Sequence, residues 1–234
     1  MPYCAEYCLE MPDDFPTNEL VAFMSAARGV LLDPSAGPEW SEFGGASNLI
    51  GWRFRASSEH WGTYKRSWQE YGSNVNHEGI YERDRALFGM FSSGVACIES
   101  TIYALAALSS HPRVLSLKFG PREQRACSPK QLLAWIAPLK SCAALTTRLS
   151  SICTSSEWQL WVDLRNRMSH RSNLPRITFG AVGGDPPPAK ALHFAATTST
   201  PVVEGELESF DALHYWLTQS LRDLLLEGVK LCPA

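Results

Sequence analysis

The sequence predicts a mainly helical protein, folded as an up-and-down helical bundle. Apolar residues recur at steps of three and four along several long stretches, a spacing that places them on one face of a helix. Hydrophobic residues make up 45% of the 234 positions and charged residues 19%, which is the composition of an ordinary globular protein. Eight Trp and ten Phe supply the bulk for a substantial core.

The chain is expected to divide at about residue 75. Residues 1–75 are predicted to form a partly helical N-terminal extension that is rich in loops and holds only short helices. Pro, Gly and Ser are frequent at 32–46, which predicts a loop there, and a second short helix is expected from residue 57. Residues 76–234 are expected to form the helical bundle itself.

The helices of the bundle can be placed from their apolar spacing. The stretch 80–110 lacks proline and is apolar almost all round, which predicts a helix at the centre of the bundle. A Ser-Pro pair at 128–129 is typical of a helix start, and the apolar spacing continues to about residue 149. Further helices are predicted at 158–171 and 207–231.

A small β-hairpin is expected between the last two helices. Two short segments with strand composition, 176–182 and 191–197, flank a run of Gly, Gly and Asp followed by three prolines. The sequence therefore predicts a hairpin inserted near 176–197.

Charge and cysteine content limit the classes of function. A net charge of −3 and a pI of about 6.1 are not those of a protein that coats nucleic acid, although a local basic patch would still attract an anion. The seven cysteines are odd in number and lack CxxC spacing, so we expect reduced thiols, with Cys97, Cys142 and Cys153 inside helices. No metal site and no cofactor are predicted.

A cytoplasmic protein that does not enter a membrane is expected. The chain shows no basic segment followed by an apolar run near its N-terminus, so no signal peptide is predicted. The most apolar stretch, 86–108, carries Glu99 and several hydroxyl side chains, which make insertion into a bilayer costly.

One predicted helix, 158–171, carries residues suited to chemistry. Four apolar side chains form a stripe along it: Trp158, Trp161, Leu164 and Met168. Arg165 falls within that stripe, and a guanidinium removed from water needs a partner. The partner is either an acidic residue such as Glu99 or Asp163, or an anion that enters a groove.

Arg165, Asn166 and His170 form a set able to cleave RNA without a metal ion. His170 can move the protons of a 2′-hydroxyl attack, because imidazole titrates near neutral pH. Arg165 offers a planar fork to the phosphate oxygens, and Asn166 can orient the phosphate or the imidazole. Arg167 and Arg171 are candidates for substrate binding through phosphate contacts, with a solvated helix end as the alternative for both.

One histidine does not easily serve as acid and base in the same step. Two copies of this helix, facing each other across a two-fold axis, would bring two histidines and two arginines to one groove. A homodimer is therefore expected. The alternative for His170 is a cation at the end of its helix, stabilised by the helix dipole.

The Arg165-Asn166-x-x-x-His170 motif, on the penultimate major helix of an all-α core, resembles the signature of the HEPN family. That signature is an Arg followed after four to six residues by a His, often with Asn directly after the Arg. The long alanine-rich helix at 80–110 is similar to the central helix of the family. The resemblance covers about residues 80–171 and implies an up-and-down bundle that dimerises through the motif helices.

The resemblance also implies activity and partners. Many HEPN members are metal-independent ribonucleases of toxin–antitoxin or antiviral systems, so RNA as substrate and an antitoxin as partner are expected. Other members have lost activity and keep the fold for binding. The alternative for this chain is an inactive HEPN-like helical dimer that acts as a binding or accessory protein.

Overall fold

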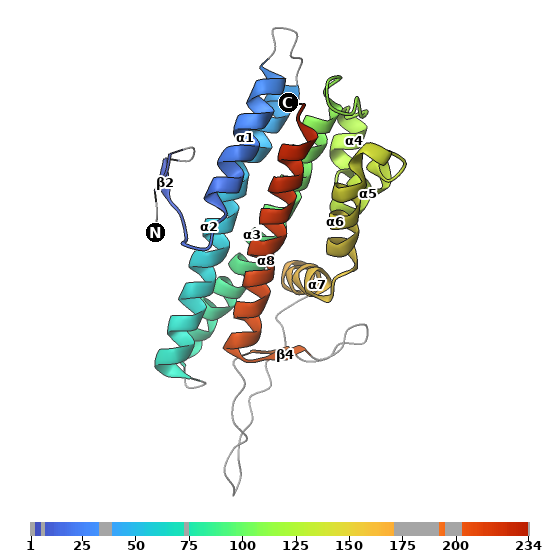
Figure 1. Cartoon of the computed structure of the whole chain (residues 1–234). Coiled ribbons are helices and arrows are strands. Elements are labelled where there is room, and N and C mark those ends of the chain that lie inside the picture. The colour runs from blue at the N-terminus through green and yellow to red at the C-terminus, as the bar shows by residue number, and fades with distance from the viewer. Residues whose placement is uncertain are drawn as a thin grey trace, which may run out of the picture.

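The computed structural model describes residues 3–5, 8–32, 39–72, 75–170, 192–194 and 203–233, and it confirms a mainly helical bundle. The helices are α1 (Thr17–Leu31), α2 (Glu39–Tyr71), α3 (His77–Ser110), α4 (Pro121–Ala126), α5 (Pro129–Ile136), α6 (Ala143–Thr154), α7 (Ser156–His170) and α8 (Leu207–Leu231). A short 3-10 turn, η1 (Lys140–Cys142), precedes α6. The long helices α1, α2, α3 and α8 run lengthwise, whereas α7 is seen nearly end-on and so crosses them (Figure 1).

The structure corrects the prediction for the N-terminal segment. Helix α2 begins at Glu39, so much of the loop expected at 32–46 is helical, and α2 is 33 residues long and not short. Three large side chains recur on one face of α2 and are 0% exposed: Phe43, Ile50 and Phe54. Burial of this face outweighs the weak helix propensity of the two glycines near its start.

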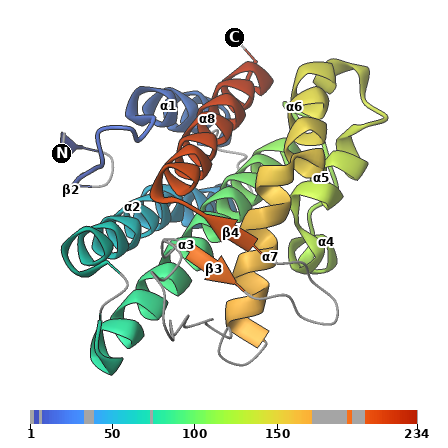
Figure 2. The same ribbon diagram turned by 90° about the horizontal axis from the view of Figure 1, so that it is seen from below.

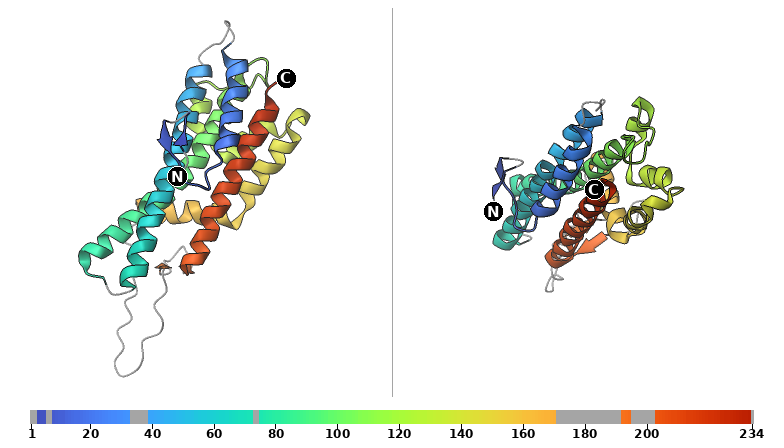
Figure 3. Two further views of the ribbon diagram at one scale, coloured as in Figure 1. Left: turned by 60° about the vertical axis from the view of Figure 1, so that its left-hand side comes forward. Right: turned by 45° about the horizontal axis from the view of Figure 1, so that its top comes forward.

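Elements before and after residue 75 contribute side chains to one hydrophobic core. Helices α2 and α3 run side by side as a long hairpin, and α1 packs against α8 (Figure 3). The segment 1–75 therefore supplies two of the long helices of the bundle.

Helix α3 is the central helix, as its composition predicts. Helices α2, α7 and α8 all pack against it. It begins after Asn76, whose Oδ1 accepts a hydrogen bond from the Gly79 N–H at 2.9 Å. Of the described helices, α3 alone is long and apolar enough to cross a membrane, and 72% of that apolar window is buried inside the bundle. This burial is that of a core helix.

The helix expected from 129 to about 149 is interrupted. Helix α5 ends at Ile136 and α6 begins at Ala143, because Pro138 has no N–H to donate and its ring crowds the preceding turn. The start of α5 is as predicted, because Ser128 Oγ accepts a hydrogen bond from the Gln131 N–H at 3.2 Å. The last helix, α8, has the predicted bounds.

Two small antiparallel hairpins accompany the helices. Strand β1 (Tyr3–Cys4) pairs with β2 (Leu9–Glu10), and β3 (Leu192–Phe194) pairs with β4 (Val203–Gly205). A strand was expected at 191–197, but its observed partner is β4, which leads directly into α8 (Figure 2). The other predicted strand, 176–182, lies outside the described residues.

Arg83 closes the connection between α2 and α3. Its side chain is buried and donates hydrogen bonds to the carbonyl oxygen of Ser67 at 2.5 Å, the Oγ of Ser67 at 2.9 Å and the carbonyl oxygen of Gly72 at 2.6 Å. The guanidinium also lies 5.2 Å from the centre of the Trp68 ring. Arg83 thus binds the last turn of α2 and also Gly72, whose carbonyl group lies past the end of the helix.

Candidate functional site

Helix α7, which carries the Arg165-Asn166-x-x-x-His170 motif, packs against α3 through its predicted apolar stripe. All four stripe residues belong to the hydrophobic core: Trp158, Trp161, Leu164 and Met168. Trp161 is 0% exposed, and its Nε1 donates to the carbonyl oxygen of Leu213 in α8 at 3.4 Å. The indole lies directly over Gly94 of α3, where an added Cβ would come within 2.7 Å of the ring carbon Cη2. A glycine at this position allows the close approach of α7.

Arg165 lies at the edge of this packed face. Its side chain is 31% exposed, and its Nη2 lies 3.7 Å from Oε1 of Glu99 on α3. That separation is too long for a hydrogen bond. Arg165 Nε is buried and has no hydrogen-bond partner among the described residues. The expected acidic neighbour is therefore present, yet the exposed part of the guanidinium keeps donors that an anion can reach; the buried Nε is not one of them.

Asn166 and His170 follow on the same helix. Asn166 is exposed, and His170 is the last residue of α7. Residues four apart are neighbours on a helix surface, so α7 brings these two positions to one side, as the sequence predicts. The His170 side chain lies outside the described part of the structure.

Arg167 does not lie at a solvated helix end, so that expectation is wrong. The residue is 2% exposed, and its Nη2 lies 2.6 Å from Oδ2 of Asp163, one turn earlier. Helix α7 contacts α6 as well as α3, so more than one of its faces is covered. A side chain this deeply buried cannot reach a phosphate from solvent in this conformation. Arg171, the other predicted substrate-binding residue, lies outside the described residues.

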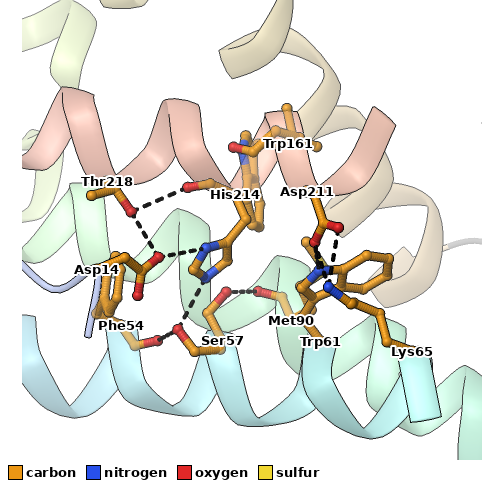
Figure 4. A network of polar contacts seen from close by, with 12 residues as sticks. Asp14, Phe54, Ser57, Trp61, Lys65, Met90, Trp161, Asp211, His214 and Thr218 are labelled. Carbon is orange, nitrogen blue, oxygen red and sulfur yellow. Dashed lines mark hydrogen bonds and ion pairs between the residues drawn. The ribbon is translucent and has the colours of Figure 1, made fainter. Parts of the chain in front are cut away.

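A second polar cluster joins the segment before α1 to α2 and α8 (Figure 4). His214 of α8 is 7% exposed; its Nδ1 lies 3.3 Å from Asp14 Oδ2 and its Nε2 lies 3.0 Å from Ser58 Oγ. Thr218 Oγ1 donates to the same oxygen of Asp14 at 3.2 Å. The sequence does not predict this cluster, because its members come from three distant segments and no spacing links them.

Two arrangements of hydrogen satisfy the contacts of His214 in this cluster. Ser58 Oγ lies 3.1 Å from the carbonyl oxygen of Phe54, one turn earlier, and 3.0 Å from His214 Nε2, and its single hydrogen serves one of the two. His214 Nε2 is the donor to Ser58 when the hydroxyl bonds to Phe54, and it is the acceptor when the hydroxyl turns to the ring.

The order Asp, His, Ser does not make a hydrolase triad. The hydroxyl of Ser58 also has a backbone carbonyl group within hydrogen-bond distance. Backbone N–H groups in the middle of α2 are used within the helix and cannot form an oxyanion hole. The cluster holds the fold together and does not activate a nucleophile.

Asp14 is the carboxylate in contact with the His214 ring. Burial alone would raise the pKa of its carboxyl, but the hydrogen bond and charge of His214, together with hydrogen bonds from its own backbone and from Thr218, bring this pKa below its ordinary value. A lowered carboxyl pKa contributes stability above the unfolded-state pKa and loses it as pH falls through the folded-state pKa. The contribution of the contact between Asp14 and α8 to stability is therefore lost in acid.

Asp211, one turn before His214 on α8, adds a second tie to α2. Its Oδ1 accepts hydrogen bonds from Trp61 Nε1 at 2.6 Å and from Lys65 Nζ at 2.9 Å (Figure 4). The ammonium of Lys65 also lies 5.7 Å from the centre of the Trp61 ring. These contacts fix the start of α8 against α2.

Cys97 and Cys127 offer no second reactive centre. All seven cysteines are unpaired. Burial raises the pKa of Cys97 to about 12 against the opposing charge of Arg53, and burial with the charge of Glu99 raises the pKa of Cys127 to about 12. Both thiols stay protonated at neutral pH and are inert as nucleophiles. Over the described ranges, no group of three His, Cys, Asp or Glu side chains could hold a metal ion.

Comparison with protein-family models, with curated proteins and with solved structures finds no match for this chain. Function is therefore inferred from the chemistry of α7 and from the motif that it carries.

Proposed function

We propose that the protein is a metal-independent endoribonuclease of the HEPN type that acts through Arg165, Asn166 and His170. The state of Arg165 is the observation that carries this proposal. Its guanidinium is partly exposed, and its carboxylate neighbour lies beyond hydrogen-bond distance. Such a group gains two charge-assisted hydrogen bonds when a phosphate binds.

The reaction needs no group beyond these side chains and the RNA. His170 removes the proton of a 2′-hydroxyl, whose oxygen then bonds to the neighbouring phosphorus. The bond from phosphorus to the 5′-oxygen breaks, and that oxygen takes up a proton from a second acid. Arg165 stabilises the charge that builds on the non-bridging oxygens, and Asn166 orients the phosphate. The products end in a 2′,3′-cyclic phosphate and a 5′-hydroxyl.

A homodimer supplies the second acid. Two α7 helices related by a two-fold axis place the second His170 on the other side of the scissile phosphate. Arg171, directly after the motif, remains the candidate for a further phosphate contact. Arg167 has a different role, because its buried charge is paired with Asp163. A monomer with full activity would contradict this part of the proposal.

An inactive HEPN-like dimer is the second candidate, and Glu99 is the observation that favours it. This carboxylate lies beside the guanidinium of Arg165 and competes with a phosphate for it. In that case the α7 face binds a protein partner, such as an antitoxin or an accessory subunit. In the first case the protein acts on RNA in the cytoplasm, as a toxin or in defence.

Cleavage of RNA in EDTA by matched variants tests the proposal. His170→Ala is expected to lower the rate of cleavage by roughly 10²–10⁴-fold, the usual contribution of a general acid or base. Arg165→Ala should lower it through lost stabilisation of charge. Arg148→Ala is the control, since Arg148 is 45% exposed on α6 and only pairs with Asp223 at 2.9 Å.

The outcomes separate the two candidates. Cleavage by wild type and Arg148→Ala, and not by His170→Ala, supports the ribonuclease. Equal cleavage by wild type and His170→Ala would show that the activity belongs to a contaminant. A folded dimer that cleaves no RNA would favour the binding protein.

A further inference from the structure

Two arginines from different helices reach the same turn of α3. Arg165 of α7 lies beside Glu99. Arg53 of α2 donates two hydrogen bonds from Nη1, to the carbonyl oxygen of Ala96 at 2.9 Å and to Oγ of Ser100 at 2.5 Å. Arg53 is half-buried, and its Nη2 is neither buried nor bonded among the described residues. The surface of α3 thus continues from the candidate site to a second guanidinium with an unused donor.

Beyond this turn, α2 and α3 carry exposed aromatic and basic side chains on their outer surface. On α2, Leu49 and Trp52 directly precede Arg53 on the helix surface, and they are 42% and 58% exposed. On α3, Arg85 is exposed and Phe88 is 44% exposed. Positions 85, 88, 92 and 96 recur at steps of three and four, so they share the face of α3 that Arg53 contacts. These five side chains, Leu49, Trp52, Arg53, Arg85 and Phe88, are called the α2–α3 face.

Contacts between the two helices fix how this face is laid out. Arg53 bonds to Ala96, whereas Ser57, one turn later on α2, donates from Oγ to the carbonyl oxygen of Met90 at 3.0 Å. The two helices therefore run in opposite directions along each other. Phe88 lies eight residues before Ala96 on α3, which is about 12 Å along the helix axis. The face is thus long enough to contact several nucleotides of one strand.

The charge of the α2–α3 face is positive. Residues 43–58 of α2 and 85–98 of α3 contain neither Asp nor Glu, although the chain as a whole has a net charge of −3. Arg53 and Arg85 carry the charge of the face. Arg55 belongs to another side of α2, since it bonds to the N-terminal segment. Two neighbouring helices without a carboxylate over this length attract an anionic partner.

We propose that an unpaired RNA strand binds along the α2–α3 face, next to the phosphate that is cleaved at Arg165. Arg53 and Arg85 contact its phosphates, and Trp52 and Phe88 stack against its bases. The bases of a duplex are already stacked on one another, so this mode of binding needs an unpaired strand. The inference rests on the proposed function, from which it takes RNA as the substrate and the place of the cleaved phosphate.

A protein partner is the other occupant that these side chains could suit. Exposed Trp and Arg side chains are common at the centre of protein interfaces. The lack of carboxylates over both helices favours a polyanion, and the position of Arg53 beside the turn that Arg165 reaches connects the face to the candidate site. RNA is therefore the occupant that the charges and the layout favour.

Binding is measured with an RNA that cannot be cleaved, so the result does not depend on ribonuclease activity. The full chain is titrated in EDTA into a fluorescein-labelled strand of about 12 nucleotides, a length within the range that one binding surface covers. Its 2′-O-methyl groups remove the attacking hydroxyl. Fluorescence anisotropy gives the affinity for this strand and for the same strand annealed to its complement. Tighter binding of the single strand is expected.

Two exposed positions carry the test, because variants there should remain folded. Trp52→Ala is expected to weaken binding of the single strand about tenfold through the loss of one stacked base. Tyr215→Ala, at a side chain that is 63% exposed on α8, is its control and should bind as the wild type does. Arg85→Gln should lower the slope of log affinity against log salt by about 0.7, the value for one phosphate contact on a single strand. Arg148→Gln, on α6, should leave this slope unchanged.

Equal affinity of the wild type, Trp52→Ala and Arg85→Gln would overturn the proposal, and so would a wild type that binds no single strand. An altered sedimentation of Trp52→Ala with unchanged affinity for RNA would assign the face to a protein interface instead. Ordinary RNA separates this inference from the proposed function. If the variants change binding as expected and ordinary RNA is not cleaved, the ribonuclease fails and the face stands. If ordinary RNA is cleaved and Trp52→Ala binds and cleaves it as the wild type does, the face fails and the ribonuclease stands.

Discussion

Gly94→Ala is expected to destabilise the protein by about 1–3 kcal/mol, the usual cost of overpacking a core. The added methyl group would come within 2.7 Å of Cη2 of Trp161, and that indole is 0% exposed and cannot move aside into solvent. The clash pushes α7 away from α3. The free energy of unfolding in urea measures the effect.

Gly44→Ala is the matched control for this substitution. Gly44 also lies within a helix, but a Cβ there meets nothing within 4 Å. Alanine should therefore stabilise α2 by roughly 0.5–1 kcal/mol, because it loses less backbone freedom on folding than glycine. The two variants should change stability in opposite directions. If Gly94→Ala were as harmless as Gly44→Ala, the account of how α7 is seated would be wrong.

Arg83→Met is expected to cost about 3 kcal/mol or more. The residue is 2% exposed, and its guanidinium donates three hydrogen bonds at the end of α2. Methionine fills part of the space but removes these donors from Ser67 and Gly72, and a hydrogen bond from a charged group contributes about 1.5–3 kcal/mol.

Arg85→Met on the same helix is the control for Arg83→Met. Arg85 is exposed, and its guanidinium lies 5.9 Å from the centre of the Tyr81 ring. Exposed cation–π contacts are worth about 0.5–1 kcal/mol, so this variant should lose no more than that. Equal losses for both variants, measured by urea unfolding, would show that Arg83 does not cap α2.

The elements that the sequence predicted well are those defined by local periodicity. Helix α8 has the expected bounds. Helix α3 differs from its prediction only in beginning directly after its cap residue, Asn76, instead of at residue 80. The start of α2 was missed because helix formation there depends on burial of Phe43 against other helices, which a run of Pro, Gly and Ser conceals. The pairing of β3 with β4 was missed because partners of a strand are set by tertiary contacts.

The candidate site likewise combines features set by helical spacing, which could be predicted, with features set by tertiary contacts, which could not. The spacing of Arg165, Asn166 and His170 on a helix could be predicted, as could an acidic neighbour for Arg165. The burial of Arg167 could not, because helical position says which residues share a face and not which faces are covered. His214 had no predicted partner, since Asp14 meets it only through the fold.

The identity of the RNA termini tests the central claim most directly. Wild-type protein is incubated in EDTA with an RNA of defined sequence, and with the same RNA carrying a 2′-deoxy nucleotide at the cleaved position. Attack by the 2′-hydroxyl predicts fragments that end in a 2′,3′-cyclic phosphate and no cleavage at the substituted position. Cleavage that persists at the 2′-deoxy position, or products that carry a 5′-phosphate, would contradict the mechanism assigned to Arg165 and His170.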